Sequence, residues 1–225
     1  MNGWTLVFDL DGTLVDTAPD LAAAANHVMR HLGLSSVTEA EIRPFVGYGA
    51  LVMIDKAALA HGRELKQHEL YGLFEVFIQH YMANIADHSK PYEGVVAALE
   101  AFTNEGAKVA VCTNKIEAHA RALLSALDMD RHFAAITGRD TFAVFKPDPG
   151  HLTGTVALAK GSREKAIMIG DSETDIRTAK AAGIPVIAVD FGYSLEPVAT
   201  FAPDAIISHY DELGEALRKL ANGRA

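Results

Sequence analysis

Short apolar runs without polar interruptions recur along the chain, and they constrain its fold more than any other feature. Continuous runs of this kind are typical of parallel strands that are buried on both faces of a sheet. We expect strands at residues 5–8, 108–112, 166–169, 185–189 and 205–207. The intervening segments carry helical signals, such as apolar spacing or a terminal glycine, at residues 95–102, 118–127, 148–160 and 175–182. Strands that alternate with helices predict a doubly wound, Rossmann-like α/β domain with a parallel sheet.

One long segment, residues 17–90, interrupts this alternation because it contains almost no β-type run. Residues 21–32, 50–61 and 67–85 have helical patterns instead. We therefore expect an α-helical domain inserted after the first strand. The α/β core is then built from residues 1–16 and 91–225.

Charge and cysteine content narrow the classes of partner. The 225 residues include 29 acidic and 20 basic ones, for a net charge of −9, which argues against nonspecific binding to nucleic acid. A cleft can still attract a small anionic ligand, because local charge can oppose the global sign. The single cysteine, Cys112, cannot form an intrachain disulfide, and no membrane helix or signal peptide is visible. These features favour a cytoplasmic protein with no membrane partner. The sequence does not specify the oligomeric state, monomer or homodimer.

Two acidic pairs follow apolar runs. Asp9 and Asp11 end the first run just before Gly12, and Asp171 and Asp175 follow the run at 166–169. Carboxylates at the end of a buried run are costly unless they are neutralised, and Mg²⁺ is well suited because it prefers oxygen ligands. The alternatives are an Asp-Gly turn for the first pair and, for the second, acidic residues that favour a helix N-terminus.

Two further clusters are polar or basic. Thr113 and Asn114 follow the run at 108–112, where a hydroxyl group and backbone N–H groups can bind a phosphate oxygen. The alternative is that one of them caps the next helix. Lys146 lies between Phe145 and a proline turn, which can aim its ammonium group at a fixed point and offset negative charge. The alternative is a solvated lysine.

All four clusters lie at the carboxyl ends of the expected parallel strands. In an open α/β sheet this edge is where ligands bind. Four independent polar clusters at one edge favour a single site over four unrelated turns.

The four clusters resemble the signature motifs of the haloacid dehalogenase superfamily. Residues 9–14, Asp-Leu-Asp-Gly-Thr-Leu, resemble the first motif. The second motif is matched by Thr113-Asn114, the third by Lys146-Pro147, and the fourth by Gly170-Asp171 with Asp175. The helical insert resembles the C1 cap of that superfamily. Within it, the chain is most similar to phosphoglycolate phosphatases, on residues 8–17, 45–49, 113–115 and 146–149.

This resemblance implies phosphoryl transfer with Mg²⁺ as cofactor. It makes Asp9 the nucleophile that forms an aspartyl-phosphate, and Asp11 the general acid and then the general base. Asp9 and Asp171 would bind the metal through carboxylates and Asp11 through its backbone carbonyl. Asp175 would bind the metal or lie just behind its ligands, the latter being favoured.

The resemblance also implies the substrate contacts. Thr113 and Asn114 would hold the phosphoryl oxygens, and Lys146 would balance the charge of nucleophile and phosphate. In the insert, residues 45–49 are the expected substrate-facing loop because Gly47 permits close backbone approach. Arg43 is a candidate for a two-point contact with a substrate carboxylate, with a surface arginine as the alternative.

The activity that the resemblance implies is hydrolysis of a small phosphorylated metabolite, with 2-phosphoglycolate giving glycolate and phosphate as the leading expectation. Another phosphatase or mutase of the same superfamily, acting on pyrophosphate, a nucleotide or a sugar phosphate, is one alternative. A noncatalytic module that binds metal and phosphate is the alternative from another class.

Overall fold

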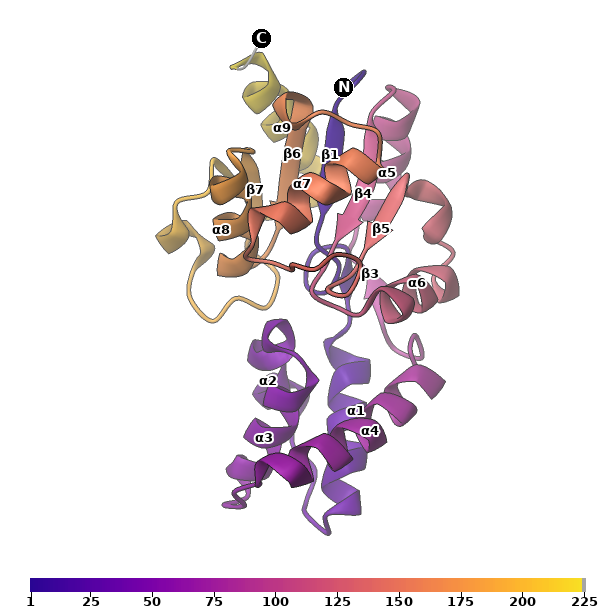
Figure 1. Cartoon of the computed structure of the whole chain (residues 1–225), viewed down its shortest axis with the longest axis vertical. Helices are drawn as coiled ribbons and strands as arrows, with labels where there is room; N and C mark the ends of the chain where they lie inside the picture. Colours follow the sequence, from indigo (N-terminus) through magenta and orange to yellow (C-terminus); the bar gives the residue numbers. More distant parts are fainter. Residues whose placement is uncertain (224–225) are drawn as a thin grey trace. The chain divides into compact units, whose positions relative to one another are not determined.

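The protein folds into two compact units in the computed structural model, which describes residues 1–223 (Figure 1). The first unit combines Met1–Val15 with the chain from Pro91 onward, and the second unit is Asp16–Lys90. Two short strands, β2 (Val15–Asp16) and β3 (Lys90–Pro91), form a two-stranded sheet where the chain passes between the units. No helix among the described residues is long and apolar enough to cross a membrane.

A six-stranded parallel sheet forms the centre of the first unit, in the order β5-β4-β1-β6-β7-β8. Its strands are β1 (Thr5–Phe8), β4 (Lys108–Cys112), β5 (Ala135–Thr137), β6 (Ala166–Gly170), β7 (Val186–Val189) and β8 (Ala205–Ile207). The five expected strands are all present, and the doubly wound α/β fold is confirmed. The sequence analysis missed β5, because three residues at a sheet edge are too short to give a pattern.

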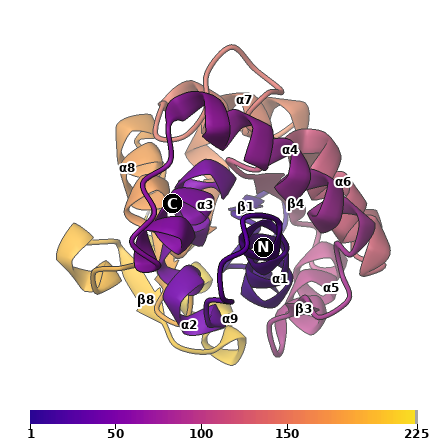
Figure 2. The ribbon, with the colours of Figure 1, turned by 90° about the horizontal axis from the view of Figure 1, so that it is seen from below.

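Helices cover both faces of this sheet. They are α5 (Val95–Asn104), α6 (Glu117–Ala126), α7 (Pro149–Leu158), α8 (Glu173–Ala182) and α9 (Leu213–Asn222). Helices α7 and α8 lie on one face, and α5 and α9 lie on the other (Figure 2). Short 3₁₀ turns at Asp130–His132, Arg163–Lys165, Val198–Phe201 and Tyr210–Glu212 complete the unit. Helix α9 lies outside the predicted helices.

The strand register explains the two buried faces. Val7 of β1 lies beside Ala110 of β4 and Met168 of β6, and all three pack into the cluster formed with α7 and α8. Leu6 and Phe8 are also fully buried and point to the opposite face, since side chains alternate along a strand. Burial on both faces is why these strands read as continuous apolar runs.

The second unit is helical, with α1 (Ala18–His31), α2 (Glu39–Ile42), α3 (Ala50–Ala60) and α4 (Gln67–Ala83). The expected substrate loop at 45–49 is instead part of a 3₁₀ helix, Arg43–Tyr48, which ends at Gly49 with φ +89°. Proline at the start of Arg43–Tyr48 favours this helical turn because its φ is fixed near the helical value.

A buried carboxylate ties the two ends of the helical unit together. Asp20, in the first turn of α1, accepts hydrogen bonds from the backbone N–H groups of His88 and Ser89 and from the Ser89 hydroxyl, the last at 2.6 Å. Asp20 and Ser89 are both buried. The network fixes the returning chain against α1 just before it enters β3.

Candidate active site

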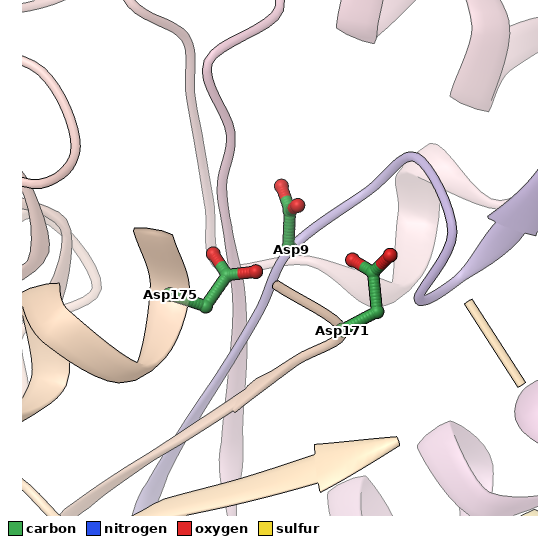
Figure 3. Close-up of side chains that lie close together, drawn as sticks. All are labelled: Asp9, Asp171 and Asp175. Carbon is green, nitrogen blue, oxygen red and sulfur yellow. The ribbon is translucent and has the colours of Figure 1, made fainter. Parts of the chain in front are cut away.

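Three carboxylates converge at the carboxyl edge of the sheet in the first unit. Asp9 follows β1, Asp171 follows β6, and Asp175 lies in the first turn of α8. Each offers an oxygen within 4.8 Å of those of the other two (Figure 3). Of the four predicted metal-site residues, the structure thus brings the carboxylates of three together. The fourth, Asp11, has its carboxylate in a separate ion pair.

Lys146 lies between two of these carboxylates. Its Nζ is 2.6 Å from Asp175 Oδ1 and 2.9 Å from Asp9 Oδ1, and the side chain is 2% exposed. Burial alone would lower the pKa of Lys146, but the charges of Asp175 and Asp9 outweigh it and raise the pKa well above its usual value. The ammonium group is therefore charged, and the solvated-lysine alternative is wrong. Lys146 is, however, nine residues beyond β5, in the loop before α7, rather than directly at a strand end.

The carboxylates of Asp9 and Asp171 are destabilised in their ionised form. Burial, and then repulsion from Asp175 and Asp9, raises the pKa of Asp171 to about 8. Burial is also the main cause that raises the pKa of Asp9 to about 6, partly offset by Lys146. Hydrogen bonds to Asp171 from the Tyr193 backbone N–H at 2.7 Å and the Thr13 hydroxyl at 3.1 Å hold it in place.

Two glycines allow the backbone to pack directly against Asp171. A β-carbon at Gly192 would lie 2.2 Å from Asp171 Cβ, and one at Gly12 would lie 2.5 Å from Asp171 Oδ2. Gly12 also has φ +81°, which favours glycine on its own. The loops around Asp171 thus leave no room for a larger residue, and the orientation of its carboxylate is fixed.

Asp175 is fixed by the start of α8. Its Oδ2 accepts a hydrogen bond from the Ser172 hydroxyl at 2.6 Å, and its backbone N–H donates back to Ser172 Oγ, which forms a capping box. With Oδ2 used in the cap and Oδ1 bound to Lys146, Asp175 orients the lysine as well as the helix. Glu173, on the same turn, pairs with Arg177 on the exposed side of the helix.

Thr113 and Asn114 follow β4 but do not cap α6, whose N-cap is Ile116. Thr113 Oγ1 accepts a hydrogen bond from the Lys115 backbone N–H at 3.2 Å. The Asn114 side-chain amide donates to the Lys146 carbonyl at 2.9 Å, so it connects the second and third motifs. The capping alternative is therefore wrong for both residues.

The sequence analysis missed two residues at this edge. Lys115 pairs with Asp11, with Nζ at 3.0 Å from Asp11 Oδ1. His151, in α7, accepts a hydrogen bond from the Lys146 backbone N–H through Nδ1, and burial is the first cause that lowers its pKa to about 4. Lys115 directly follows the second motif, which was a usable signal. The contact of His151 with Lys146 was not visible before the turn was known.

The two predicted residues of the helical insert lie in the second unit. Arg43 pairs with Asp16 at 2.8 Å and with Glu39 at 2.7 Å. Gly47 lies in the 3₁₀ helix, with open space where a β-carbon would be. The Arg43 side chain is 32% exposed and lies between two carboxylates, so a substrate anion would have to compete with them.

The three clustered carboxylates fit a hard divalent cation. Their donor set is all oxygen, which Mg²⁺ prefers. Asp9 Oδ1 is buried and has no hydrogen bond among the described residues, although Lys146 Nζ is 2.9 Å away. The Lys146 ammonium group offsets one of the three negative charges of the cluster, and a divalent cation would offset the other two. A bound cation would also relieve the repulsion that raises the pKa values of Asp9 and Asp171.

Known proteins match nearly the whole chain. A relative from Mesorhizobium japonicum named phosphoglycolate phosphatase is 53% identical, over 96% of this chain and 97% of its own. One of the same name from Agrobacterium fabrum is 44% identical, over 94% and 91%. The crystal structure of a predicted phosphoglycolate phosphatase from Haemophilus somnus 129PT has a TM-score of 0.88 at 29% identity, over 96% of this chain and 98% of that one.

The motif-bearing part of the chain carries the family assignment. The match to the haloacid dehalogenase-like hydrolase family extends over residues 6–189, from β1 to the end of β7, and includes every carboxylate and lysine described above. The chain therefore belongs to the haloacid dehalogenase-like hydrolase family.

Proposed function

We propose that this protein is a Mg²⁺-dependent phosphatase that hydrolyses 2-phosphoglycolate to glycolate and phosphate through an aspartyl-phosphate on Asp9. The observation that carries the proposal is the group at the sheet edge: the oxygens of Asp9, Asp171 and Asp175 within 4.8 Å of one another, with the Lys146 ammonium among them. The names of relatives at 53% and 44% identity support this substrate.

In this proposal the Asp9 and Asp171 carboxylates and the Asp11 backbone carbonyl would hold Mg²⁺. Asp175 lies behind them, because its two oxygens already bind Lys146 and Ser172. When bound, the ion screens the negative charges of nucleophile and phosphate so that the two can approach. Its oxygen-rich surroundings are typical of magnesium sites in proteins.

The first chemical step is attack by an Asp9 carboxylate oxygen on phosphorus. The bond between phosphorus and the ester oxygen breaks, and Asp11 gives its proton to the departing oxygen, so glycolate leaves with a hydroxyl group. Lys146 stays beside Asp9 and offsets the charge that collects on the phosphoryl group.

The second step returns Asp9 to its free form. Asp11, now a carboxylate, takes a proton from water while the water oxygen attacks phosphorus, and the bond between Asp9 and phosphorus breaks. Phosphate leaves, and Asp11 is again protonated. Thr113 and the backbone at Asn114 bind the phosphoryl oxygens in both steps, while the Asn114 side chain keeps Lys146 in position.

The helical unit Asp16–Lys90 is proposed to act as a cap that excludes water from the site while the aspartyl-phosphate forms. Arg43 and the backbone at Gly47 are its candidate substrate contacts. We propose a cytoplasmic location, with a small phosphorylated metabolite as the partner.

The test is turnover of about twenty small phosphate esters with Mg²⁺ present, then with EDTA. We expect the highest kcat/KM for 2-phosphoglycolate, loss of activity in EDTA, and loss of activity in a folded Asp9→Asn variant. A lead for pyrophosphate, a nucleotide or a sugar phosphate would replace the substrate but keep the chemistry. A folded protein without metal-dependent turnover would refute the proposal and favour a noncatalytic module.

A further inference from the structure

Lys115 is a partly buried cation that the proposed chemistry does not use. It follows β4 directly after Thr113 and Asn114. Its Nζ lies 3.0 Å from Asp11 Oδ1 and 3.3 Å from Asp11 Oδ2, and its side chain is 9% exposed. Lysines are rarely buried so far without a reason, because the ammonium group is strongly hydrated.

Lys115 and Lys146 neutralise different carboxylates of the site. Lys146 lies between Asp9 and Asp175, two members of the carboxylate cluster. Lys115 instead lies beside Asp11, whose carboxylate is outside that cluster. An ammonium group has three N–H donors and can contact two carboxylates at once, as Lys146 does.

The position of Asp11 determines which part of a substrate that anion is. Asp11 is proposed to exchange a proton with the ester oxygen, so its carboxylate must come within hydrogen-bond distance of that oxygen. In 2-phosphoglycolate one methylene group separates the ester oxygen from the carboxylate carbon. A substrate carboxylate this close to the ester oxygen can contact a cation that lies 3.0 Å from Asp11.

Arg43 is a weaker candidate for the same contact. It is already held by Asp16 and Glu39, at 2.8 and 2.7 Å, so a substrate anion would have to compete with two carboxylates. Lys115 is in addition the more buried of the two, at 9% against 32% side-chain exposure, and buried charges are screened less by water.

We propose that the Lys115 ammonium binds the substrate carboxylate and so selects phosphate esters whose leaving group carries a negative charge next to the ester oxygen. This inference rests on the proposed function and names the residue responsible for its specificity. The simpler alternative is that Lys115 only orients Asp11. The two differ in their effect on a substrate that lacks the carboxylate.

The test compares 2-phosphoglycolate with 2-hydroxyethyl phosphate, in which a hydroxymethyl group replaces the carboxylate. The measured quantity is the ratio of the two kcat/KM values, because any loss that acts through Asp11 affects both substrates and cancels. We expect Lys115→Met to lower this ratio about 10- to 100-fold, the usual effect of a charged hydrogen bond. Lys115→Arg should retain most of the ratio. So should Lys180→Met, because Lys180 lies on α8 and its ammonium group donates to the Phe201 carbonyl.

Binding gives a second readout that does not depend on turnover. In an Asp9→Asn background with Mg²⁺, calorimetric titration should show about 10- to 100-fold weaker binding of 2-phosphoglycolate when Lys115→Met is added, with little change for 2-hydroxyethyl phosphate. An unchanged ratio, or equal weakening of both ligands, would overturn the role of Lys115. A parent enzyme that turns over other phosphate esters but not 2-phosphoglycolate would instead overturn the proposed substrate, so the two failures can be told apart.

Discussion

Replacement of Lys146 by methionine tests the electrostatics of the site most directly. Methionine is similar in length to lysine and fills the same space, so the main loss is the charge. Lys146 Nζ lies 2.6 Å from Asp175 and 2.9 Å from Asp9, with both ion pairs largely out of water. At an effective dielectric constant of about 20, each contact corresponds to about 6 kcal/mol of attraction before desolvation is subtracted.

The net effect is smaller than the sum of these attractions, because the folded protein has already lost the hydration of all three groups. Removal of one partner from a buried ion pair typically costs about 3–5 kcal/mol. For a chain of this size, this corresponds to a fall in the melting temperature of about 6–20 °C. We expect this loss for Lys146→Met in EDTA, together with a large loss of phosphatase activity.

The assay is thermal and urea unfolding of the metal-free protein at pH 8, with Lys180→Met as the matched control. The double variant Lys146→Met/Asp175→Asn should recover part of the loss, since it removes a carboxylate that the single variant leaves uncompensated. If Lys146→Met unfolds within about 1 kcal/mol of the parent, like the control, or if the double variant recovers nothing, buried charge compensation is not what Lys146 provides.

Three further outcomes can be measured. Burial raises the pKa of Asp9 to about 6 and of Asp171 to about 8, so these two carboxyls bind more protons in the folded protein, whereas His151, with its pKa lowered to about 4, binds fewer below about pH 6.5. The free energy of unfolding in EDTA should therefore fall as the pH rises from about 6.5 to 8, where Asp171 dominates, and a rise in that range would contradict its raised pKa. Gly192→Ala should weaken Mg²⁺ binding at least tenfold in calorimetry, because the new β-carbon would lie 2.2 Å from Asp171 Cβ. The control is Gly72→Ala, which has open space at its β-carbon. It should leave Mg²⁺ binding unchanged and stabilise α4 by up to about 1 kcal/mol. Asp20→Ala should lower the free energy of unfolding by about 3 kcal/mol in urea, since it leaves buried donors without an acceptor, and a loss below about 1 kcal/mol would contradict the proposed network.

The strands could be predicted because each buried strand is a run of consecutive apolar residues in the sequence. A parallel strand covered by helices on both faces is apolar wherever both faces are covered, as residues 6–8 and 109–112 are. Strand β5 gave no such signal, because Ala135–Thr137 is short and pairs on one side alone. The carboxylates were also visible, since a charge directly after a buried run has few explanations.

The partners of those charges could not be predicted in the same way. Lys115 and Asp11 are 104 residues apart, and Lys146 and Asp175 are 29 apart, so no local pattern links them. The hydrogen bond from the Asn114 side-chain amide to the Lys146 carbonyl, 32 residues along the chain, was not visible either. Such contacts depend on how the loops after neighbouring strands lie against each other.

At the proposed magnesium site, the charges of the sheet edge make metal binding and protonation compete. When every group is ionised, the site holds four carboxylates and two ammonium groups, from Asp9, Asp11, Asp171, Asp175, Lys115 and Lys146. Two negative charges remain, which one divalent cation cancels. Without it, burial favours protons on the carboxylates, as the raised pKa values of Asp9 and Asp171 indicate. A metal ion must displace those protons, so its affinity should increase with pH over the same range in which the metal-free protein loses stability.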